Sequence, residues 1–244
     1  MSGLIFIISA PSGSGKSTLT ERLRSIVPNL QFSVSYTTRP PRGSEESGRH
    51  YNFVSRETFE QMIRQGDFLE YADVFGNYYG TPRSVLAEAF AKGNDVWLDI
   101  DVQGAAQVKR KLPEATSIFV LPPSREELER RLRQRAEADD EIQRKLRGDG
   151  ARRFNTKEII QRRLQTASRE IENFCDYDYI LVNDRLDPSV DILKAIVKTK
   201  RLGQSGEIAD PQYRAVVATA ERALRPNMME QVENILKTFV PHTF

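Results

Sequence analysis

The sequence predicts an α/β fold: a parallel sheet flanked by helices, with a small β-rich subdomain and a helical basic lid inserted into it. Two observations predict this class. Short apolar runs alternate with segments of helical periodicity along most of the chain, which indicates parallel strands joined by helices. A glycine-rich stretch also separates the first apolar run from the first helical segment, and loops of this kind bind phosphate groups.

Length and composition limit the possible classes of protein. The 244 residues suffice for one α/β domain with insertions, or for a domain with an appendage. Lys and Arg (36) nearly balance Asp and Glu (34), so nothing marks the whole chain as a nucleic-acid binder. The one cysteine, Cys175, cannot form an intrachain disulfide and fits a cytoplasmic location. The first apolar run is too short to span a membrane, so no membrane partner is expected.

The first apolar run, Leu4 to Ile8, predicts a buried parallel strand. The stretch from Ala10 to Thr18 follows it, and a segment with helical spacing comes next. A glycine-rich loop in this position is typical of the P-loop, so the predicted sheet is of the P-loop NTPase type. The usual motif begins with glycine rather than Ala10, but this position opens the turn and need not contact phosphate.

The residues of this loop have chemical roles in that interpretation. Gly13 and Gly15 let several backbone N–H groups face one anion. Lys16 places a positive charge on the β- and γ-phosphates of a nucleotide, and the Ser17 hydroxyl can bind Mg²⁺. The sequence therefore predicts a nucleotide-phosphate site at this loop.

Residues 33–81 contain several short predicted strands and are predicted to form the small β-rich subdomain. A subdomain inserted beside a P-loop would hold the second substrate. Pro40 and Pro41 end its first strand and hold an extended loop. A short helix is expected before Gly66. The predicted strands lie at 32–38, 50–54, 68–75 and 78–81.

Charged residues of this subdomain are candidate ligand contacts. Arg39 and Arg42 flank the two prolines, and the planar arginine fork suits phosphate, although a solvated basic loop is the other interpretation. Glu70 lies in an otherwise apolar strand, where a carboxylate needs partners. Its side chain either faces solvent or binds a ligand that carries donor groups.

The remaining strands and helices alternate as the fold requires. Helices are predicted at 82–92, 102–112 and 190–197, and strands at 95–101, 116–121 and 179–182. The strand at 95–101 ends in two acids, Asp99 and Asp101. It resembles a Walker B arrangement, which supports Mg²⁺ or its waters at the sheet edge where α/β proteins bind ligands.

Residues 125–169 form the predicted lid, the most charged part of the chain, with 14 Lys and Arg against 9 Asp and Glu. Its candidate functional residues are Arg131, Arg135 and Arg163. Most charge runs are solvated helix faces, but a mobile basic flap beside a P-loop could close over phosphates and exclude water.

Two amphipathic helices are predicted after residue 204, one opening at Asp210 and one following a break at Pro226. Each helix must bury an apolar stripe. The stripes either pack on the core of the same chain or form a contact in a homodimer.

Over about residues 3–200 the sequence resembles the guanylate kinase family. The resemblance rests on the P-loop together with segments 34–42, 48–54, 68–70, 76–81, 98–104 and 182–184. It implies phosphoryl transfer from ATP to GMP, and to dGMP, with Mg²⁺. The corresponding parts are a core (3–32, 82–124 and 170–203), a GMP-binding subdomain (about 33–81), the lid (about 125–169) and a C-terminal helical extension (204–244).

The resemblance also implies roles for individual residues. The GMP phosphate would contact Ser35, Arg39, Arg42, Tyr51 and Tyr79. The guanine base would contact Glu70, Thr81 and Asp101. ATP would contact Ala10, Pro11, Ser12, Gly13, Ser14, Gly15, Lys16, Ser17, Thr18 and Asn183. The catalytic groups would be Lys16, Arg131, Arg135 and Arg163, and Mg²⁺ would be bound by Ser17 and, through water, by Asp99.

These residue types suit the implied reaction. Glu70 can accept from the N1 and N2 donors of guanine, and Thr81 can donate to O6; adenine loses both pairings, and such sites reject analogues by about 10⁴ or more. The GMP phosphate, with a second pKa of about 6, is already a dianion at neutral pH and needs no general base. Lys16, the arginines and Mg²⁺ would neutralise charge instead, with Arg135 the most important residue of the lid.

The lid departs from the family pattern. Ala136 follows Arg135 where the family has glycine, and a charged insert lies within 137–156. Arg153 or Arg162 could therefore take the role of Arg163.

Two other functions are compatible with parts of the sequence: a peptide-binding scaffold without catalysis, and a P-loop kinase for another phosphorylated small molecule such as a ribose bisphosphate. Lys16 and the phosphate-site arginines argue against the first, and the base-binding set argues against the second. The basic lid lacks an aromatic stacking platform, so no nucleic-acid partner is expected. The expected partners are ATP and GMP.

Overall fold

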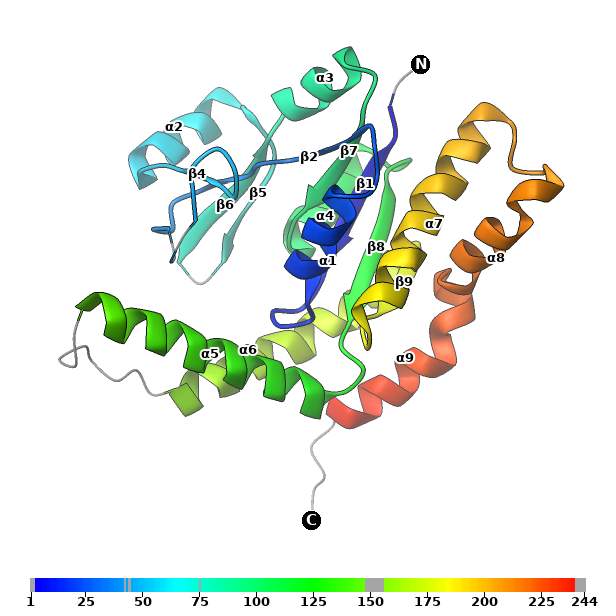
Figure 1. The fold of residues 1–244 in the computed structure, drawn as a ribbon. Coiled ribbons are helices and arrows are strands. Elements are labelled where there is room, and N and C mark those ends of the chain that lie inside the picture. The colour runs from blue at the N-terminus through cyan, green and yellow to red at the C-terminus, as the bar shows by residue number, and fades with distance from the viewer. Residues whose placement is uncertain (1–2, 42, 44, 75, 148–155, 240–244) are drawn as a thin grey trace. The chain divides into compact units, whose positions relative to one another are not determined.

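The computed structural model describes residues 3–41, 43, 45–74, 76–147 and 156–239 (Figure 1). The chain divides into two compact units. The first comprises Met1–Ser9 and Arg24–Ser117, and the second comprises Ala10–Leu23 and Ile118–Phe244. Arg42 and Arg153, two of the residues with roles predicted from the sequence, lie outside the described residues.

The larger sheet has five parallel strands in the order β2-β7-β1-β8-β9, which confirms the predicted α/β class. The strands are β1 (Ile5–Ser9), β2 (Leu30–Phe32), β7 (Asp95–Asp99), β8 (Thr116–Leu121) and β9 (Tyr179–Val182). Strands β1 and β8 are buried along their whole length, as expected of parallel strands covered on both faces. In the first unit, the Trp97 ring lies 6.0 Å from the rings of Phe6 and Phe32 and is fully buried.

The smaller sheet lies in the first unit and has the order β4-β3-β6-β5. Its strands are β3 (Tyr36–Thr37), β4 (Asn52–Phe53), β5 (Phe68–Val74) and β6 (Asn77–Pro82). Strands β5 and β6 form an antiparallel hairpin, visible in Figure 1 beside α2 (Arg56–Gln65), while β3 and β4 run parallel. Phe59 of α2 stacks on Phe68 and Tyr78, with ring centroids 4.4 and 5.2 Å apart, and anchors the helix.

The single strand predicted at 32–38 was wrong. The segment contains two short strands in different sheets: β2 pairs with β7, and β3 pairs with β6. Residues 33–35 carry the chain from one sheet to the other. Because the alternation of side chains continues across this crossing, the periodicity does not reveal that the hydrogen-bonding partner changes.

Helices α3 (Ser84–Ala91) and α4 (Val102–Lys111) complete the first unit and match their predicted positions. The predicted strand at 95–101 was too long, because β7 ends at Asp99. Asp101 instead forms the N-cap of α4, and its Oδ1 accepts a hydrogen bond from the Gly104 N–H at 2.8 Å. The carboxylate is thus fixed at the beginning of a helix.

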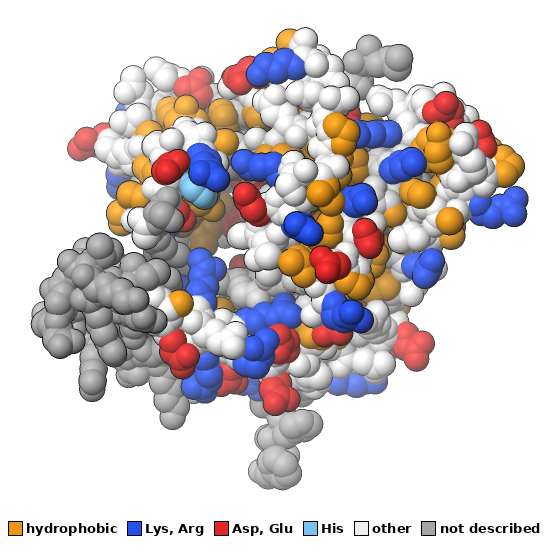
Figure 2. All heavy atoms as spheres, viewed as in Figure 1, with side chains coloured by type: hydrophobic (Ala, Val, Ile, Leu, Met, Phe, Trp, Pro, Cys, Tyr) orange, Lys and Arg blue, Asp and Glu red, His pale blue; other side chains and the backbone are white. Residues whose placement is uncertain are grey.

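The second unit contains α1 (Lys16–Arg24), α5 (Arg125–Arg147), α6 (Thr156–Ile171) and α7 (Leu186–Ser205). Helices α5 and α6 pack against each other within the segment predicted as the lid, and Ser124 caps α5 by accepting from the Glu127 N–H. Acidic and basic side chains are mixed on the face of α5 that Figure 2 shows. The ion pairs along this helix include Glu127–Arg130 and Glu129–Arg133. Helix α7 is longer than the segment predicted at 190–197.

The C-terminal extension contains a 3₁₀ turn, η2 (Pro211–Tyr213), then α8 (Arg214–Arg222) and α9 (Arg225–Phe239). Pro226 was expected to break the helix, but it lies in the first turn of α9, where proline is tolerated. Val232, Ile235 and Phe239 of the apolar stripe are buried within the chain. No helix of the described part of the chain has the length and apolar character needed to cross a membrane.

Candidate active site

The glycine-rich loop joins β1 to α1. The Ser14 N–H donates to the Pro11 carbonyl at 3.1 Å, and the Leu19 N–H donates to the Gly15 carbonyl at 3.1 Å. Gly13 (φ 96°) and Gly15 (φ 88°) have backbone angles in the region that L side chains rarely adopt. A Cβ at Gly15 would also overlap the Asn183 amide nitrogen, so glycine is required there for two reasons.

The loop has the features of an anion site. Its backbone leads directly into the N-terminus of α1, where Lys16 is the first helical residue. The Ser14 hydroxyl is fully buried and has no hydrogen-bond partner among the described residues. A buried, unsatisfied donor in a glycine-rich loop is what a phosphate oxygen would satisfy. Ser17 and Thr18 are exposed on the first turn of α1.

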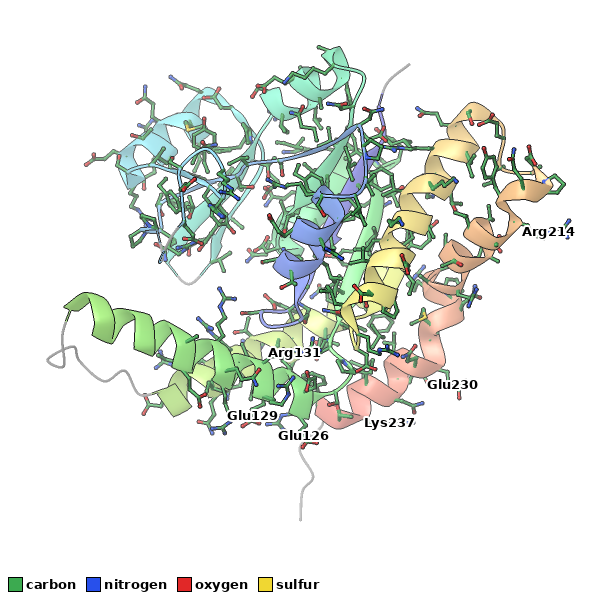
Figure 3. All side chains as sticks on the ribbon, viewed as in Figure 1. Glu126, Glu129, Arg131, Arg214, Glu230 and Lys237 are labelled. Carbon is green, nitrogen blue, oxygen red and sulfur yellow. The ribbon has the colours of Figure 1, made fainter. Side chains whose placement is uncertain are left out.

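Arg131 and Asn183 meet at this loop. The Arg131 Nη2 donates to the Asn183 carbonyl at 3.0 Å and its Nη1 donates to the Ser14 carbonyl at 3.4 Å. The buried Asn183 side chain donates to the same Ser14 carbonyl at 2.8 Å. Figure 3 shows Arg131 extending from α5 on the side opposite to Glu126 and Glu129. The structure therefore brings together the predicted loop, one predicted lid arginine and the predicted adenine-side residue.

Glu127 holds Arg131 in this position. Its carboxylate accepts from the Arg131 Nε at 2.7 Å and from two nitrogens of Arg130 at 2.6 and 2.7 Å. The hydrogen bond from Arg130, followed by that from Arg131, lowers the pKa of Glu127 to about 2 against the opposing effect of burial. No role was predicted for Glu127 from the sequence; the signal available was its spacing of four residues before Arg131 on a predicted helix.

The other lid arginines have different environments. Arg135 lies one helical turn beyond Arg131 on α5 and is exposed. On α6, Arg162 is exposed while Arg163 is half-buried and interacts with its surroundings. They lie on α5 and α6, which span the segment predicted as the lid, and both the lid role of these helices and the contacts of these arginines with substrate stay predictions.

The predicted base-binding residues lie together in the first unit. Thr81 of β6 is opposite Glu70 of β5, and its hydroxyl lies 3.2 Å from the Ser35 hydroxyl. The side chains of Glu70, Thr81 and Ser35 are buried, and Glu70 is only 3% exposed. Glu70 therefore does not face solvent, which removes one of the two interpretations of this residue.

Gly104 leaves room for the Glu70 carboxylate. A Cβ added at Gly104 would overlap Glu70 Oε2 and would lie 3.2 Å from Asp101 Oδ1. The two carboxylates therefore lie at the N-terminal turn of α4, whose partial positive charge favours anions. Glu70 and Asp101 were predicted to bind the base together with Thr81, whereas no role was predicted for Gly104.

Three of the predicted phosphate-binding residues, Arg39, Tyr51 and Tyr79, form a cluster. Arg39 is 7% exposed, and its guanidinium lies 5.4 Å from the centre of the Tyr51 ring. The Tyr51 ring meets the Tyr79 ring edge-on at 5.8 Å. Burial disfavours the charge on Arg39, but the hydrogen bonds and charge of Glu45 outweigh it, so the pKa of Arg39 is raised. Glu45 is a second residue for which the sequence predicted no role.

The predicted Mg²⁺ ligands lie in different units. Asp99 is the last residue of β7 and is half-buried with interactions of its own, while Ser17 belongs to α1. Their assignment to a common ion stays a prediction.

Comparison with known proteins identifies relatives over most of the chain. A family model described as guanylate kinase matches residues 3–200. The guanylate kinase of Koribacter versatilis is 52% identical over 239 residues, covering 98% of this chain and 97% of that protein. The guanylate kinase of Escherichia coli K12 is 44% identical over 205 residues, covering 83% of this chain and 91% of that protein. The crystal structure of guanylate kinase from Anaplasma phagocytophilum is similar with a TM-score of 0.63 at 33% identity, covering 82% of this chain and 87% of that one.

Proposed function

Because this chain belongs to the guanylate kinase family, whose members phosphorylate GMP with ATP, we propose that its two residue clusters bind the two substrates of that reaction. The cluster around Arg39 and Glu70 in the first unit binds GMP. The glycine-rich loop with Arg131 and Asn183 in the second unit binds ATP. The observation that carries the proposal is the burial of Glu70 beside Thr81, because this pair places a carboxylate acceptor next to a hydroxyl donor, which matches the N–H donors and the O6 acceptor of guanine.

Recognition of the base follows from these side chains. Glu70 accepts from N1–H and the 2-amino group of guanine, and the Thr81 hydroxyl donates to O6. Asp101, held as the N-cap of α4, presents its second carboxylate oxygen to the 2-amino group. None of these contacts involves the ribose 2′-hydroxyl, so dGMP is a second acceptor.

The GMP phosphate is bound by the arginine and tyrosine cluster. Arg39 supplies its planar fork, and Tyr51 and Tyr79 supply hydroxyl groups. Ser35, whose hydroxyl lies 3.2 Å from the Thr81 hydroxyl, supplies a further hydroxyl group. Arg42 would add a second positive charge.

The phosphates of ATP are bound by the backbone of Ala10 to Thr18, with Lys16 on the β- and γ-phosphates. Asn183 lies on the adenine side, and Arg131, Arg135 and Arg163 contribute positive charge from the lid. In the described part of the chain no group of three His, Cys, Asp or Glu side chains could hold a metal ion. Phosphate oxygens would therefore supply much of the Mg²⁺ coordination, with the Ser17 hydroxyl and a water held by Asp99.

The transferred group passes directly from ATP to GMP. A phosphate oxygen of GMP is the nucleophile, and it is already ionised at neutral pH, so no side chain must remove a proton. Arginines and Lys16 offset the repulsion between the two anionic substrates and stabilise the charge on the transferring phosphoryl group. An arginine on that group is worth about 10³ to 10⁵ in rate in related phosphoryl transfers. Cys175, an exposed free thiol, fits the proposed cytoplasmic location.

The test is a coupled assay of ADP release with ATP and Mg²⁺, offering GMP, AMP, CMP and UMP separately. The wild type is compared with Glu70→Gln and with Glu88→Gln, an exposed change on α3 that serves as the control. We expect turnover with GMP alone, a large loss in Glu70→Gln and none in Glu88→Gln. Unchanged selectivity in Glu70→Gln would refute the base-binding role. ATP binding without turnover of any nucleotide would favour another phosphate acceptor, and loss of ATP binding as well would favour the scaffold function.

A further inference from the structure

The C-terminal extension lies beyond residue 200, where the match to the family model ends. The Koribacter versatilis relative matches 98% of this chain, so it shares most of the extension, whereas the Escherichia coli relative matches 83%. In Figure 1, α8 follows α7, and α9 runs from the end of α8 to the beginning of α5. The extension therefore reaches the lid from a part of the chain that lies outside the family match.

One hydrogen bond joins α9 to the lid helix. The Arg125 N–H donates to the Thr238 hydroxyl oxygen at 3.0 Å, and this hydroxyl donates to the Ile235 carbonyl at 2.6 Å. The first N–H groups of a helix have no partner within the helix. Ser124 satisfies that of Glu127, so Thr238 supplies a second cap from a segment 113 residues away. Thr238 thus fixes the end of α5 from which Arg131 extends.

A second set of hydrogen bonds joins the extension to β9. The Ile180 N–H donates to the Ala223 carbonyl at 2.8 Å, and the Arg225 N–H donates to the Asp178 carbonyl at 3.0 Å. β9 is the last strand in the order of the large sheet, so the junction of α8 and α9 covers its edge. Asn183 follows β9 directly, and its side chain donates to the Ser14 carbonyl.

The two attachments therefore hold the two elements that carry Arg131 and Asn183, the side chains that meet at the glycine-rich loop. Arg131 belongs to the helix that Thr238 caps, and Asn183 continues the strand that Ala223 and Arg225 pair with. The buried side chains Val232, Ile235 and Phe239 hold α9 in place between these attachments. A displacement of α9 would therefore move both groups relative to the loop.

We propose that the extension positions Arg131 and Asn183 for ATP, and that Thr238 is a positioning residue of the kinase reaction. The inference rests on the proposed role of Arg131 at the ATP phosphates. Thr238 does not touch substrate; it acts by fixing the first turn of α5. The extension thus affects the ATP side of the reaction and leaves the GMP cluster of the first unit unchanged.

The test uses three single variants of the full-length protein. Thr238→Val keeps the shape of the side chain and removes the hydroxyl, and Thr238→Ser keeps the hydroxyl. Thr219→Val is the matched control, because the Thr219 hydroxyl donates to the Ala215 carbonyl on α8 in the same way but caps no lid helix. Steady-state rates are measured while ATP and GMP are varied separately, well below the melting midpoint of each variant.

We expect Thr238→Val to lower kcat/KM for ATP about three- to tenfold, the value of one hydrogen bond, with the KM for GMP unchanged. Thr238→Ser and Thr219→Val should match the wild type. An equal change in the ATP and GMP parameters, or an effect of Thr219→Val as large as that of Thr238→Val, would mean a general loss of stability and would overturn the positioning role.

Arg131→Ala, alone and combined with Thr238→Val, separates this inference from the proposed function. We expect a large loss in Arg131→Ala and little further loss in the double variant, because Thr238 acts through Arg131. If Arg131→Ala lowers activity but Thr238→Val does not, the positioning role is wrong while the role of Arg131 stands. If Arg131→Ala leaves kcat/KM for ATP unchanged, both are wrong.

Discussion

Glu45 binds the Arg39 fork with both of its carboxylate oxygens: Nη1 lies 2.9 Å from Oε2, and Nη2 lies 3.0 Å from Oε1. The Arg39 Nη1 also donates to the Pro40 carbonyl at 2.7 Å. A guanidinium that is only 7% exposed needs an opposite charge, and this pair provides it. The geometry orients the guanidinium over the Tyr51 and Phe53 rings before any phosphate arrives.

We therefore predict that Glu45→Gln raises the KM for GMP about 10- to 100-fold and leaves the KM for ATP unchanged. The hydrogen bonds between Glu45 and Arg39 are charge-assisted. Their loss removes on the order of 1.5–3 kcal/mol of the interaction that holds the Arg39 guanidinium in the orientation for binding phosphate. Steady-state kinetics with each substrate varied will test this. A lower KM for GMP would show instead that Glu45 competes with the substrate phosphate for Arg39.

Gly104 provides a second prediction. A methyl group at this position would overlap Glu70 Oε2, while alanine should favour the surrounding helix α4. We expect Gly104→Ala to raise the KM for GMP by more than tenfold through displacement of the Glu70 carboxylate, with little change in melting temperature.

Gly203→Ala is the control for this change. Gly203 also lies inside a helix, α7, but a Cβ there would meet its nearest neighbour, Ile208, at an ordinary 3.9 Å. This variant should keep wild-type kinetics and gain about 0.5–1 kcal/mol of stability. Wild-type GMP kinetics in Gly104→Ala would mean that Glu70 can move without loss of base recognition.

Glu127 provides a prediction about pH. Its pKa falls from 4.5 to about 2 on folding, so the ionised carboxylate stabilises the folded state. For a lowered pKa, this contribution is complete above about pH 4.5 and is lost as the pH falls towards 2. Denaturant titrations should show wild type more stable than Glu127→Gln at neutral pH, with the difference shrinking over this range.

The corresponding control is Glu60→Gln, which breaks an exposed pair with Arg56 and should cost at most about 1 kcal/mol at neutral pH. If the difference between wild type and Glu127→Gln stayed constant from pH 5 to pH 2.5, the ion pairs of Glu127 would contribute nothing to stability.

Removal of residues 204–244 should lower the melting temperature and the solubility. The deletion would expose the edge of β9 and remove the apolar side chains of α9 from the core of the second unit. Thermal melts and the solution mass of both proteins will test this. Unchanged melting and unchanged mass would contradict it, and a full-length dimer that becomes a monomer would support the dimer contact.

Local patterns predicted the parallel α/β class and most of its elements. The loop from Ala10 to Thr18 was identified because a strand directly precedes it in sequence and a helix directly follows its glycines. Strands such as β1 and β8 were identified because continuous apolar runs of this length are typical of covered parallel strands. The segment at 32–38 was wrongly predicted as one strand, because alternation of side chains shows which face of a strand is apolar but not which strand is its hydrogen-bonding partner.

What the sequence determined by itself is the set of chemical groups and their order: a phosphate loop, two arginines around a Pro-Pro pair, a carboxylate within a strand and a basic lid. Only the tertiary structure decided the surroundings of these groups. The space that Gly104 leaves for Glu70, the pairing of Glu45 with Arg39 and the capping of Arg125 by Thr238 depend on segments brought together by folding. The physical reason is that backbone periodicity is local, whereas burial and hydrogen-bond satisfaction are set by residues far away in sequence.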